Sequence, residues 1–178
     1  ISRTVPTINK NIFAGCTALA NITIPFVGDG TSNNTHFGYI FGATDSSTQH
    51  EKVPSSLKEV HITKSTSLAY YVFECCVDIE TITLPEGLTT IGNGSFYHCY
   101  ALTNINLPST LVSIDEIAFD TCSGLTSIEL PSSLTIIGSS AFSGCDGLTN
   151  IVIPNSVVSI GFAAFQDCTS LASITLPF

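Results

Sequence analysis

The stretch Ala141-Phe142-Ser143-Gly144-Cys145-Asp146-Gly147-Leu148-Thr149-Asn150-Ile151-Val152-Ile153-Pro154 decides the fold, because its landmarks return every 23 residues along this 178-residue chain. Three residue types keep this spacing in register: Phe73, Phe96, Phe119, Phe142 and Phe165; Cys76, Cys99, Cys122, Cys145 and Cys168; and Pro85, Pro108, Pro131, Pro154 and Pro177. Chance does not align three columns at one period over five units. Such a period predicts stacked structural repeats, each packed against its neighbours.

An apolar triplet lies between the Cys and Pro columns, as in Leu125, Ile128 and Leu130. The spacing Leu-x-x-Ile-x-Leu is typical of the strand segment of a leucine-rich repeat. Alternation along a strand sends Ile128 and Leu130 inward and leaves Glu129 outside. The following Pro has no N–H to donate to a sheet, so we expect each strand to end there.

The second half of each unit returns the chain over the other side of the core. Apolar positions such as Leu134 and Ile137 are expected to face inward, and glycines such as Gly138 and Gly161 are expected to supply the tight bends. The sequence therefore predicts a β-rich leucine-rich repeat solenoid with a parallel sheet along one face, built from about seven 23-residue units. We expect residues 1–178 to form a single domain.

One unit, containing Leu57, Val60 and Ile62, departs from the pattern because Pro54 stands where the Cys belongs. Its Ile62 lies 38 residues after the equivalent Ile24, so the sequence predicts an insertion at about 26–53. The insertion is rich in Gly, Ser, Thr and Asn, yet it contains the apolar cluster Phe37, Tyr39, Ile40 and Phe41. A fully solvated loop would not hold such a cluster, so we expect it to fold back on the solenoid.

Both ends of the sequence fall inside a repeat, and neither carries the polar cap that a terminal repeat needs. We therefore expect the chain to be a segment of a longer repeat array.

The phrase Ala-Phe-x-x-Cys-x-x-Leu-x-x-Ile-x-Leu-Pro is complete at 118–131 and 164–177. It closely resembles the BspA-like leucine-rich repeat family, and the resemblance covers the chain apart from the insertion. That family consists mostly of surface or secreted proteins of mucosal bacteria and protozoa, and its characterised members are implicated in adhesion. The resemblance implies an extracellular or cell-surface location and a protein or glycoprotein ligand from host matrix or microbial surfaces. Its motif residues are core and turn positions, so no binding residue is carried over.

The charge distribution excludes nucleic acid as the main partner. The chain has 14 acidic and 5 basic residues, a formal net charge of −9, and no Lys or Arg after Lys64. A phosphate-binding surface needs clustered cations. No apolar run approaches the ~20 residues of a membrane helix, so we expect no membrane insertion in this segment.

The sequence offers no catalytic, cofactor or metal pattern. No Gly-x-Ser-x-Gly elbow occurs, and no Cys and His spacing converges as zinc ligands do. We therefore predict no enzymatic activity, no cofactor and no metal. The five column cysteines are expected to be small, buried core residues, with a disulfide between adjacent turns as the alternative. Cys75, beside the column, is expected to be the most exposed thiol.

Two surfaces remain for a ligand. Outward strand positions carry mainly hydroxyl and amide groups, which suit either a recognition surface or a generic solvated sheet. The insertion and the adjacent strand offer Tyr39, Lys58, Glu59 and His61, which we identify as candidate ligand-binding residues because aromatic and charged groups make better hot spots than Ser and Thr. The alternative is that the aromatic residues only fill the gap in the degenerate unit.

These observations predict an extracellular interaction or adhesion module without catalysis. A passive structural spacer that displays another domain is the alternative, and an enzymatic or regulatory domain that uses the insertion is a third hypothesis.

Overall fold

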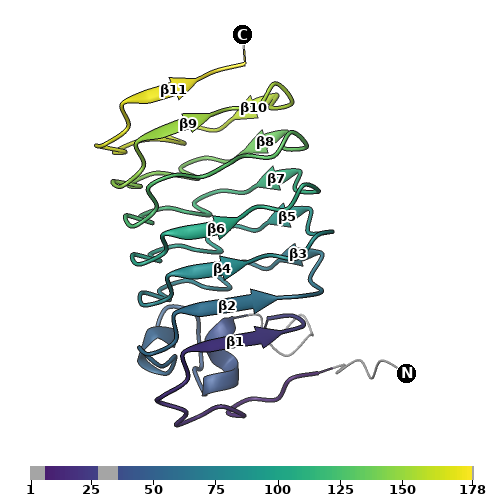
Figure 1. The fold of residues 1–178 in the computed structure, drawn as a ribbon, viewed down its shortest axis with the longest axis vertical. Coiled ribbons are helices and arrows are strands. Elements are labelled where there is room, and N and C mark those ends of the chain that lie inside the picture. The colour runs from purple at the N-terminus through teal and green to yellow at the C-terminus, as the bar shows by residue number, and fades with distance from the viewer. Residues whose placement is uncertain (1–6, 28–35, 178) are drawn as a thin grey trace.

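A computed structural model describes residues 7–27 and 36–177, and it shows a β-solenoid whose coils stack along one axis (Figure 1). The predicted leucine-rich repeat solenoid with a parallel sheet is confirmed. The main strands are β1 (Asn21–Ile24), β2 (Glu59–Ile62), β4 (Thr81–Thr83), β6 (Asn104–Asn106), β9 (Asn150–Val152) and β11 (Ser173–Thr175). Residues 28–35 of the predicted insertion lie outside the described residues.

The main strands pair in parallel as β1-β2-β4-β6 and as β9-β11. Their register places equivalent residues of successive coils side by side, for example Val60 beside Ile82 and Ile82 beside Ile105. These inward side chains are buried, whereas outward neighbours such as Asn104 and Asn106 are exposed. The alternation that the sequence predicted therefore holds along this face.

A second parallel sheet, which the sequence analysis did not anticipate, runs along another side of the solenoid (Figure 1). Its order is β10-β8-β7-β5-β3, and every strand has two residues: Ser159–Ile160, Ile136–Ile137, Ser113–Ile114, Thr90–Ile91 and Ser67–Leu68. Its inward column carries Leu68, Ile91, Ile114 and Ile137, all buried. The return half of each coil is thus a short strand as well as a core wall.

The main sheet is interrupted at Ser127–Leu130, where the sequence predicts a strand and the structure forms none. The side chains that the sequence predicts to face inward here still lie in the core, since Leu125 and Ile128 are buried. A hollow of about 480 Å³ lies between this segment and β9. The ladder of the main sheet resumes only with the pairing of β9 and β11.

The core is organised by the Phe and Cys columns. Ring centroids of successive phenylalanines from Phe73 to Phe165 lie 5.0 to 5.6 Å apart, with planes within 18° of parallel. The Cys side chains lie against the carbonyl groups of the preceding coil: Cys99 Sγ is 3.1 Å from Phe73 O, and Cys145 Sγ is 3.2 Å from Phe119 O. A thiol is small enough for this slot and donates a weak hydrogen bond.

Gly138 and Gly161 do not supply the tight bends that the sequence analysis expected of them. Gly138 and Gly161 do not have positive φ, and a Cβ on either would lie 2.5 Å or less from backbone atoms of the preceding coil. They permit close approach of two coils. The left-handed bends fall instead at positions that include Ile117, with φ of 50°, and Thr121, with φ of 61°.

The insertion folds back on the solenoid, as predicted, and supplies the missing core aromatics. The 3-10 helix η1 (Phe37–Phe41) places the Phe37 ring 4.9 Å from Phe73 and the Phe41 ring 6.0 Å from Phe13. The Phe37 N–H donates to Val72 O at 2.7 Å, the same link that joins Phe73 to Ser95 in the next coil. Phe37 and Phe41 are buried, so they fill the degenerate unit and are not surface contacts.

Gln49, in the second 3-10 helix η2 (Gln49–Glu51), ties the insertion to the regular coils. Its side chain is fully buried. Gln49 Oε1 accepts from the Gly38 N–H at 2.6 Å, and Gln49 Nε2 donates to the Glu74 carbonyl oxygen at 2.6 Å. One amide therefore pairs two backbone groups that belong to different coils.

The seven thiols differ in their exposure to solvent, and the exposure of Cys75 differs from the prediction. Cys76, Cys99, Cys122 and Cys145 are buried, Cys168 is half-buried, and none of the seven cysteines is in a disulfide. Cys75 is only partly exposed, whereas Cys16 is exposed, so the prediction that Cys75 is the most exposed thiol was wrong. Cys75 lies at a left-handed bend, with φ of 56°, and its Sγ lies 3.9 Å from His98 Nδ1, which covers it in part.

Replacing Phe119 by Ala should lower the free energy of unfolding by about 3–5 kcal/mol, because a fully buried ring is lost between two stacked neighbours. The Phe96 and Phe142 centroids lie 5.0 and 5.2 Å from it. Denaturant titration followed by circular dichroism measures the change. The control is Phe162→Ala, since Phe162 is 84% exposed and should have little effect. Equal losses in both variants would contradict the stacked core.

Replacing Gln49 by Ala should cost about 1–3 kcal/mol, because the Gly38 N–H and the Glu74 carbonyl group are left without their partner in a buried place. Thermal and denaturant unfolding of Gln49→Ala and of the exposed control Gln166→Ala test this. An unchanged midpoint for Gln49→Ala would mean that the amide does not anchor the insertion.

Thiol labelling of the native protein should modify Cys16 first and Cys75 and Cys168 more slowly. Cys76, Cys99, Cys122 and Cys145 should react only after denaturation. Burial raises the pKa of each of these four thiols, so the reactive thiolate is scarce in the folded state. Mass spectrometry of timed alkylation identifies the sites. Rapid native labelling of the four buried cysteines would overturn the assignment.

Candidate functional site

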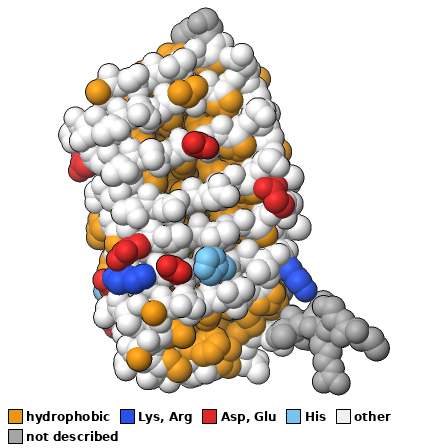
Figure 2. Space-filling model, in the orientation of Figure 1, with side chains coloured by type: hydrophobic (Ala, Val, Ile, Leu, Met, Phe, Trp, Pro, Cys, Tyr) orange, Lys and Arg blue, Asp and Glu red, His pale blue; other side chains and the backbone are white. Residues whose placement is uncertain are grey.

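The outward face of the main sheet is open to solvent and mostly uncharged. Its exposed positions carry hydroxyl and amide side chains, such as Thr103, Asn104, Asn106 and Asn150. Figure 2 shows charged and histidine side chains gathered in a band across the lower part of the molecule, at the level of β2 and β4. This band contains three of the four residues that the sequence analysis selected.

Lys58, Glu59 and His61 are brought together by β2 and its register with β4. Lys58 Nζ lies 3.5 Å from Glu80 Oε1 and 3.8 Å from Asp78 Oδ1, and it donates to the Asp78 carbonyl oxygen at 3.1 Å. His61 Nε2 lies 3.8 Å from Glu59 Oε2, and His61 Nδ1 lies 3.0 Å from Thr83 Oγ1. We call Lys58, Glu59, His61, Asp78 and Glu80 the strand-face cluster.

The cluster contributes little to stability. Its ion-paired side chains are 39 to 55% exposed. Exposed ion pairs of this kind typically stabilise a protein by about 0–1 kcal/mol. Groups of both charge signs are nevertheless held at fixed positions on a flat sheet, which suits recognition of a complementary surface.

Tyr39 lies apart from the cluster. Its ring packs edge-on against His36 at 6.1 Å and is partly buried against the core. Its backbone carbonyl oxygen accepts from the Asn11 N–H at 3.3 Å. Among the described residues, no hydrogen bond, ion pair or ring contact joins Tyr39 to Lys58, Glu59 or His61.

His36, in the insertion, is a core residue. His36 is buried and its Nε2 lies 3.4 Å from the Ala43 carbonyl oxygen. Burial lowers the pKa of His36, so its ring is neutral at pH 7. The T-shaped contact with Tyr39 is therefore packing between two aromatic rings.

Asp78 is a member of the cluster that the sequence analysis missed. It lies 20 residues after Lys58, near the 23-residue step that separates neighbours on adjacent coils. A search for opposite charges at about one period would have found it. The same reading finds Glu80, which was recognised as outward but was not paired with Lys58.

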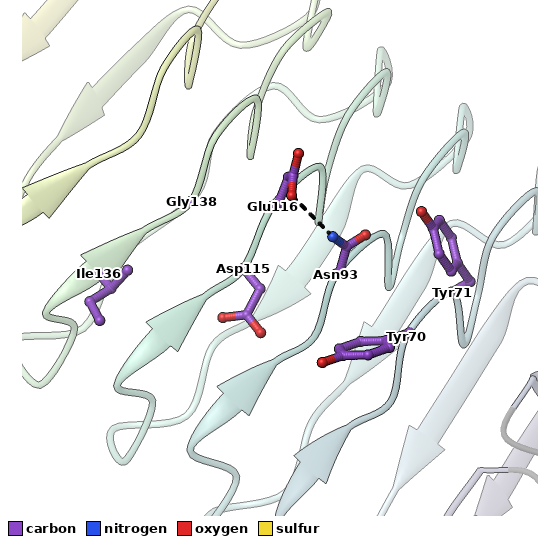
Figure 3. Close-up of a pocket in the computed structure, with 7 residues that line it drawn as sticks. All are labelled: Tyr70, Tyr71, Asn93, Asp115, Glu116, Ile136 and Gly138. Carbon is purple, nitrogen blue, oxygen red and sulfur yellow. Dashed lines mark hydrogen bonds between the residues drawn. The ribbon is translucent and has the colours of Figure 1, made fainter.

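A second hollow, also missed, lies beside the second sheet. Its volume is about 480 Å³, and it is lined by Tyr70, Tyr71, Asn93, Asp115, Glu116, Ile136 and Gly138 (Figure 3). An adjoining hollow of about 520 Å³ shares Tyr70 and Asp115 with it. Together they form an open groove that crosses several coils.

Across residues 7–27 and 36–177, no group of three or more His, Cys, Asp or Glu side chains is placed to hold a metal ion. No helix in the same ranges is long and apolar enough to cross a membrane. Both candidate sites are open surfaces, with charged groups on the main sheet and with aromatic and charged groups beside the second sheet.

Solved structures with this architecture come from several bacteria. A leucine-rich repeat protein of T. pallidum is 38% identical over 67% of this chain and 58% of its own, with a TM-score of 0.66. One from Bacteroides ovatus is 35% identical over 67% of this chain and 34% of its own, with a TM-score of 0.65. A leucine-rich cell surface protein from Faecalibacterium prausnitzii is 27% identical over 89% of this chain and 48% of its own, with a TM-score of 0.67. The chain thus spans less than two thirds of each of these proteins.

A search of curated proteins found no match. Residues 1–61 and 66–178 match the family described as BspA type leucine rich repeat region, in six copies. That match covers nearly the whole chain and agrees with the stacked Phe, Cys and Pro columns. The chain therefore belongs to the BspA-type leucine-rich repeat family.

Proposed function

We propose that this protein is an extracellular or cell-surface interaction module that binds a protein or glycoprotein ligand in adhesion and catalyses no reaction. Family membership fits a protein-interaction role. The related F. prausnitzii protein is described as a cell surface protein, which supports the location. The observation that carries the proposal is the strand-face cluster, a set of charges gathered on a mostly uncharged polar sheet.

The cluster suits a charged partner surface. Lys58 lies between two carboxylates, and Glu59 lies beside His61, so the cluster presents both signs of charge. Complementary charges across an interface fix its orientation and exclude wrong partners. A ligand would reach Lys58, Glu59 and His61 from the sheet face, whereas Tyr39 would contribute only if the ligand also extends around the coil to η1.

A passive spacer is the second candidate function. It is favoured by the outward face of the main sheet beyond the cluster, where exposed groups such as Thr103, Asn104 and Asn106 are small and where the described strands β6, β9 and β11 carry no aromatic residue. Ser, Thr and other small groups are weak hot spots. A spacer would bind none of the partners that a broad screen offers.

A binding screen against host matrix proteins and microbial surface proteins tests the proposal. For a protein that binds, Lys58→Ala and His61→Ala should each weaken the affinity about five- to thirtyfold, as loss of an interface contact of ~1–2 kcal/mol would. Asn106→Ala is the matched control, because Asn106 is exposed on the same sheet in β6. Surface plasmon resonance measures the affinities after circular dichroism has verified the fold.

Loss of binding only in Asn106→Ala would move the site away from the cluster. Tyr39→Ala separates a ligand confined to the sheet, which it leaves bound, from one that reaches η1, which it weakens. A screen in which no protein binds would favour the spacer.

A further inference from the structure

The groove beside the second sheet gathers two tyrosines, two carboxylates and an amide. Figure 3 shows the Tyr70 ring and the Asp115 carboxylate reaching toward the same space, and both residues line both hollows. Glu116 points instead toward Asn93, whose Nδ2 donates to Glu116 Oε2 at 3.4 Å. Small-molecule sites typically have volumes of roughly 300–1,000 Å³, and both hollows fall in that range.

The groove follows from the 23-residue register. Tyr70, Asn93 and Glu116 occupy the same position of three successive coils. Asp115 occupies the position that Gly92 and Gly138 hold in the coils on either side. Those glycines let the neighbouring coils approach closely, with the Gly138 position packed on the Asp115 backbone, and they place no side chain beside the Asp115 carboxylate.

The carboxylates of the groove have no cationic partner. Within the described residues, neither Asp115 nor Glu116 takes part in an ion pair. No Lys or Arg occurs in the sequence after Lys64, whereas ten acidic residues do. No cation of the described residues therefore neutralises either carboxylate through an ion pair.

Aromatic and apolar groups flank these charges. Tyr70 is 69% exposed, and Ile136, on the short strand β8, is 44% exposed and lines the same hollow. The face of a tyrosine ring attracts a cation placed within about 6 Å of its centroid. The groove thus offers a carboxylate and a ring face to one positive group, with apolar surface for its alkyl stem.

An unsatisfied acceptor lies at the same place. Asn93 Oδ1 is buried and accepts no hydrogen bond from any described residue. Buried acceptors in native proteins are usually paired, but this oxygen is closed to solvent, so it does not count as a contact for a ligand in the groove.

We propose that this groove binds an arginine side chain presented by an extended segment of a partner protein. A guanidinium group is planar, stacks on an aromatic ring and binds a carboxylate through two parallel hydrogen bonds, whereas an ammonium group is a compact, strongly hydrated charge. A neutral sugar would stack on Tyr70 but would leave the carboxylates uncompensated.

The groove lies on a different side of the solenoid from the strand-face cluster, so the two sites are tested independently. Loss of arginine binding would leave the strand-face proposal standing, and the reverse also holds.

The test is titration of the ¹⁵N-labelled protein with an acetylated, amidated peptide of alternating Gly and Arg, followed by amide chemical shifts. We expect shifts concentrated at Tyr70, Asn93, Asp115 and Glu116. Asp115→Asn and Tyr70→Ala should each weaken binding about fivefold, since each removes one of the two main contacts with the cation. No hydrogen bond or ion pair of the described residues uses the Asp115 carboxylate, so Asp115→Asn should keep the fold.

Glu129→Gln is the matched control, because it removes one exposed carboxylate from the main-sheet side and should leave binding within twofold. The matching Gly-Lys peptide should bind at least threefold more weakly than the Gly-Arg peptide. Equal weakening by Asp115→Asn and Glu129→Gln would show nonspecific attraction to an acidic protein and overturn the proposal. Equal binding of the lysine peptide, or larger groove shifts with maltotriose, would also overturn it.

Discussion

The structure depends on one constraint: each coil must lie in register on the coil before it, so that equivalent side chains stack on one another. Adjacent parallel strands are about 4.8 Å apart, and the phenylalanine centroids follow at 5.0 to 5.6 Å. A residue in such a column must pack against copies of itself. Flat Phe rings do so by stacking, and four column cysteines do so by placing their thiols against Phe carbonyl oxygens: Cys99, Cys122, Cys145 and Cys168. The Phe and Cys columns of the regular coils therefore tolerate little change, whereas outward positions vary from coil to coil.

The sequence predicts the features that recur in every coil because of this register. It does not predict features that depend on contacts between neighbouring coils. The columns of Phe119 and Cys122 reveal the solenoid because both residues recur at one phase. The two-residue strands of the second sheet are too short to give an alternating pattern. Gly138 was misread as a bend because the sequence shows a small residue but not the backbone atoms 2.5 Å from its missing Cβ. Cys16 has the same spacing to Leu19 that Cys145 has to Leu148, yet it is exposed, because burial depends on the coils packed around a residue.

The candidate sites show the same limit. The insertion could be located from its length and its aromatic residues. That Phe37 completes the core stack and Tyr39 lies away from Lys58 follows from tertiary contacts, among them the Gln49 side chain and its two backbone partners. The groove left a readable signal, since Tyr70, Asn93 and Glu116 are separated by single periods. Reading outward columns with the same care as inward ones would have revealed it.

The two outward surfaces differ in the electrostatic cost of taking a partner. At the strand-face cluster, Lys58 already faces Asp78 and Glu80, so an incoming charge must compete with contacts inside the protein. Such competition lowers the net gain and rewards only a partner whose charges match the whole arrangement. At the groove, no described residue forms an ion pair with Asp115, so an incoming positive group displaces only water there. The cluster is therefore suited to selecting among partners, and the groove is suited to holding any segment that presents one well-placed cation.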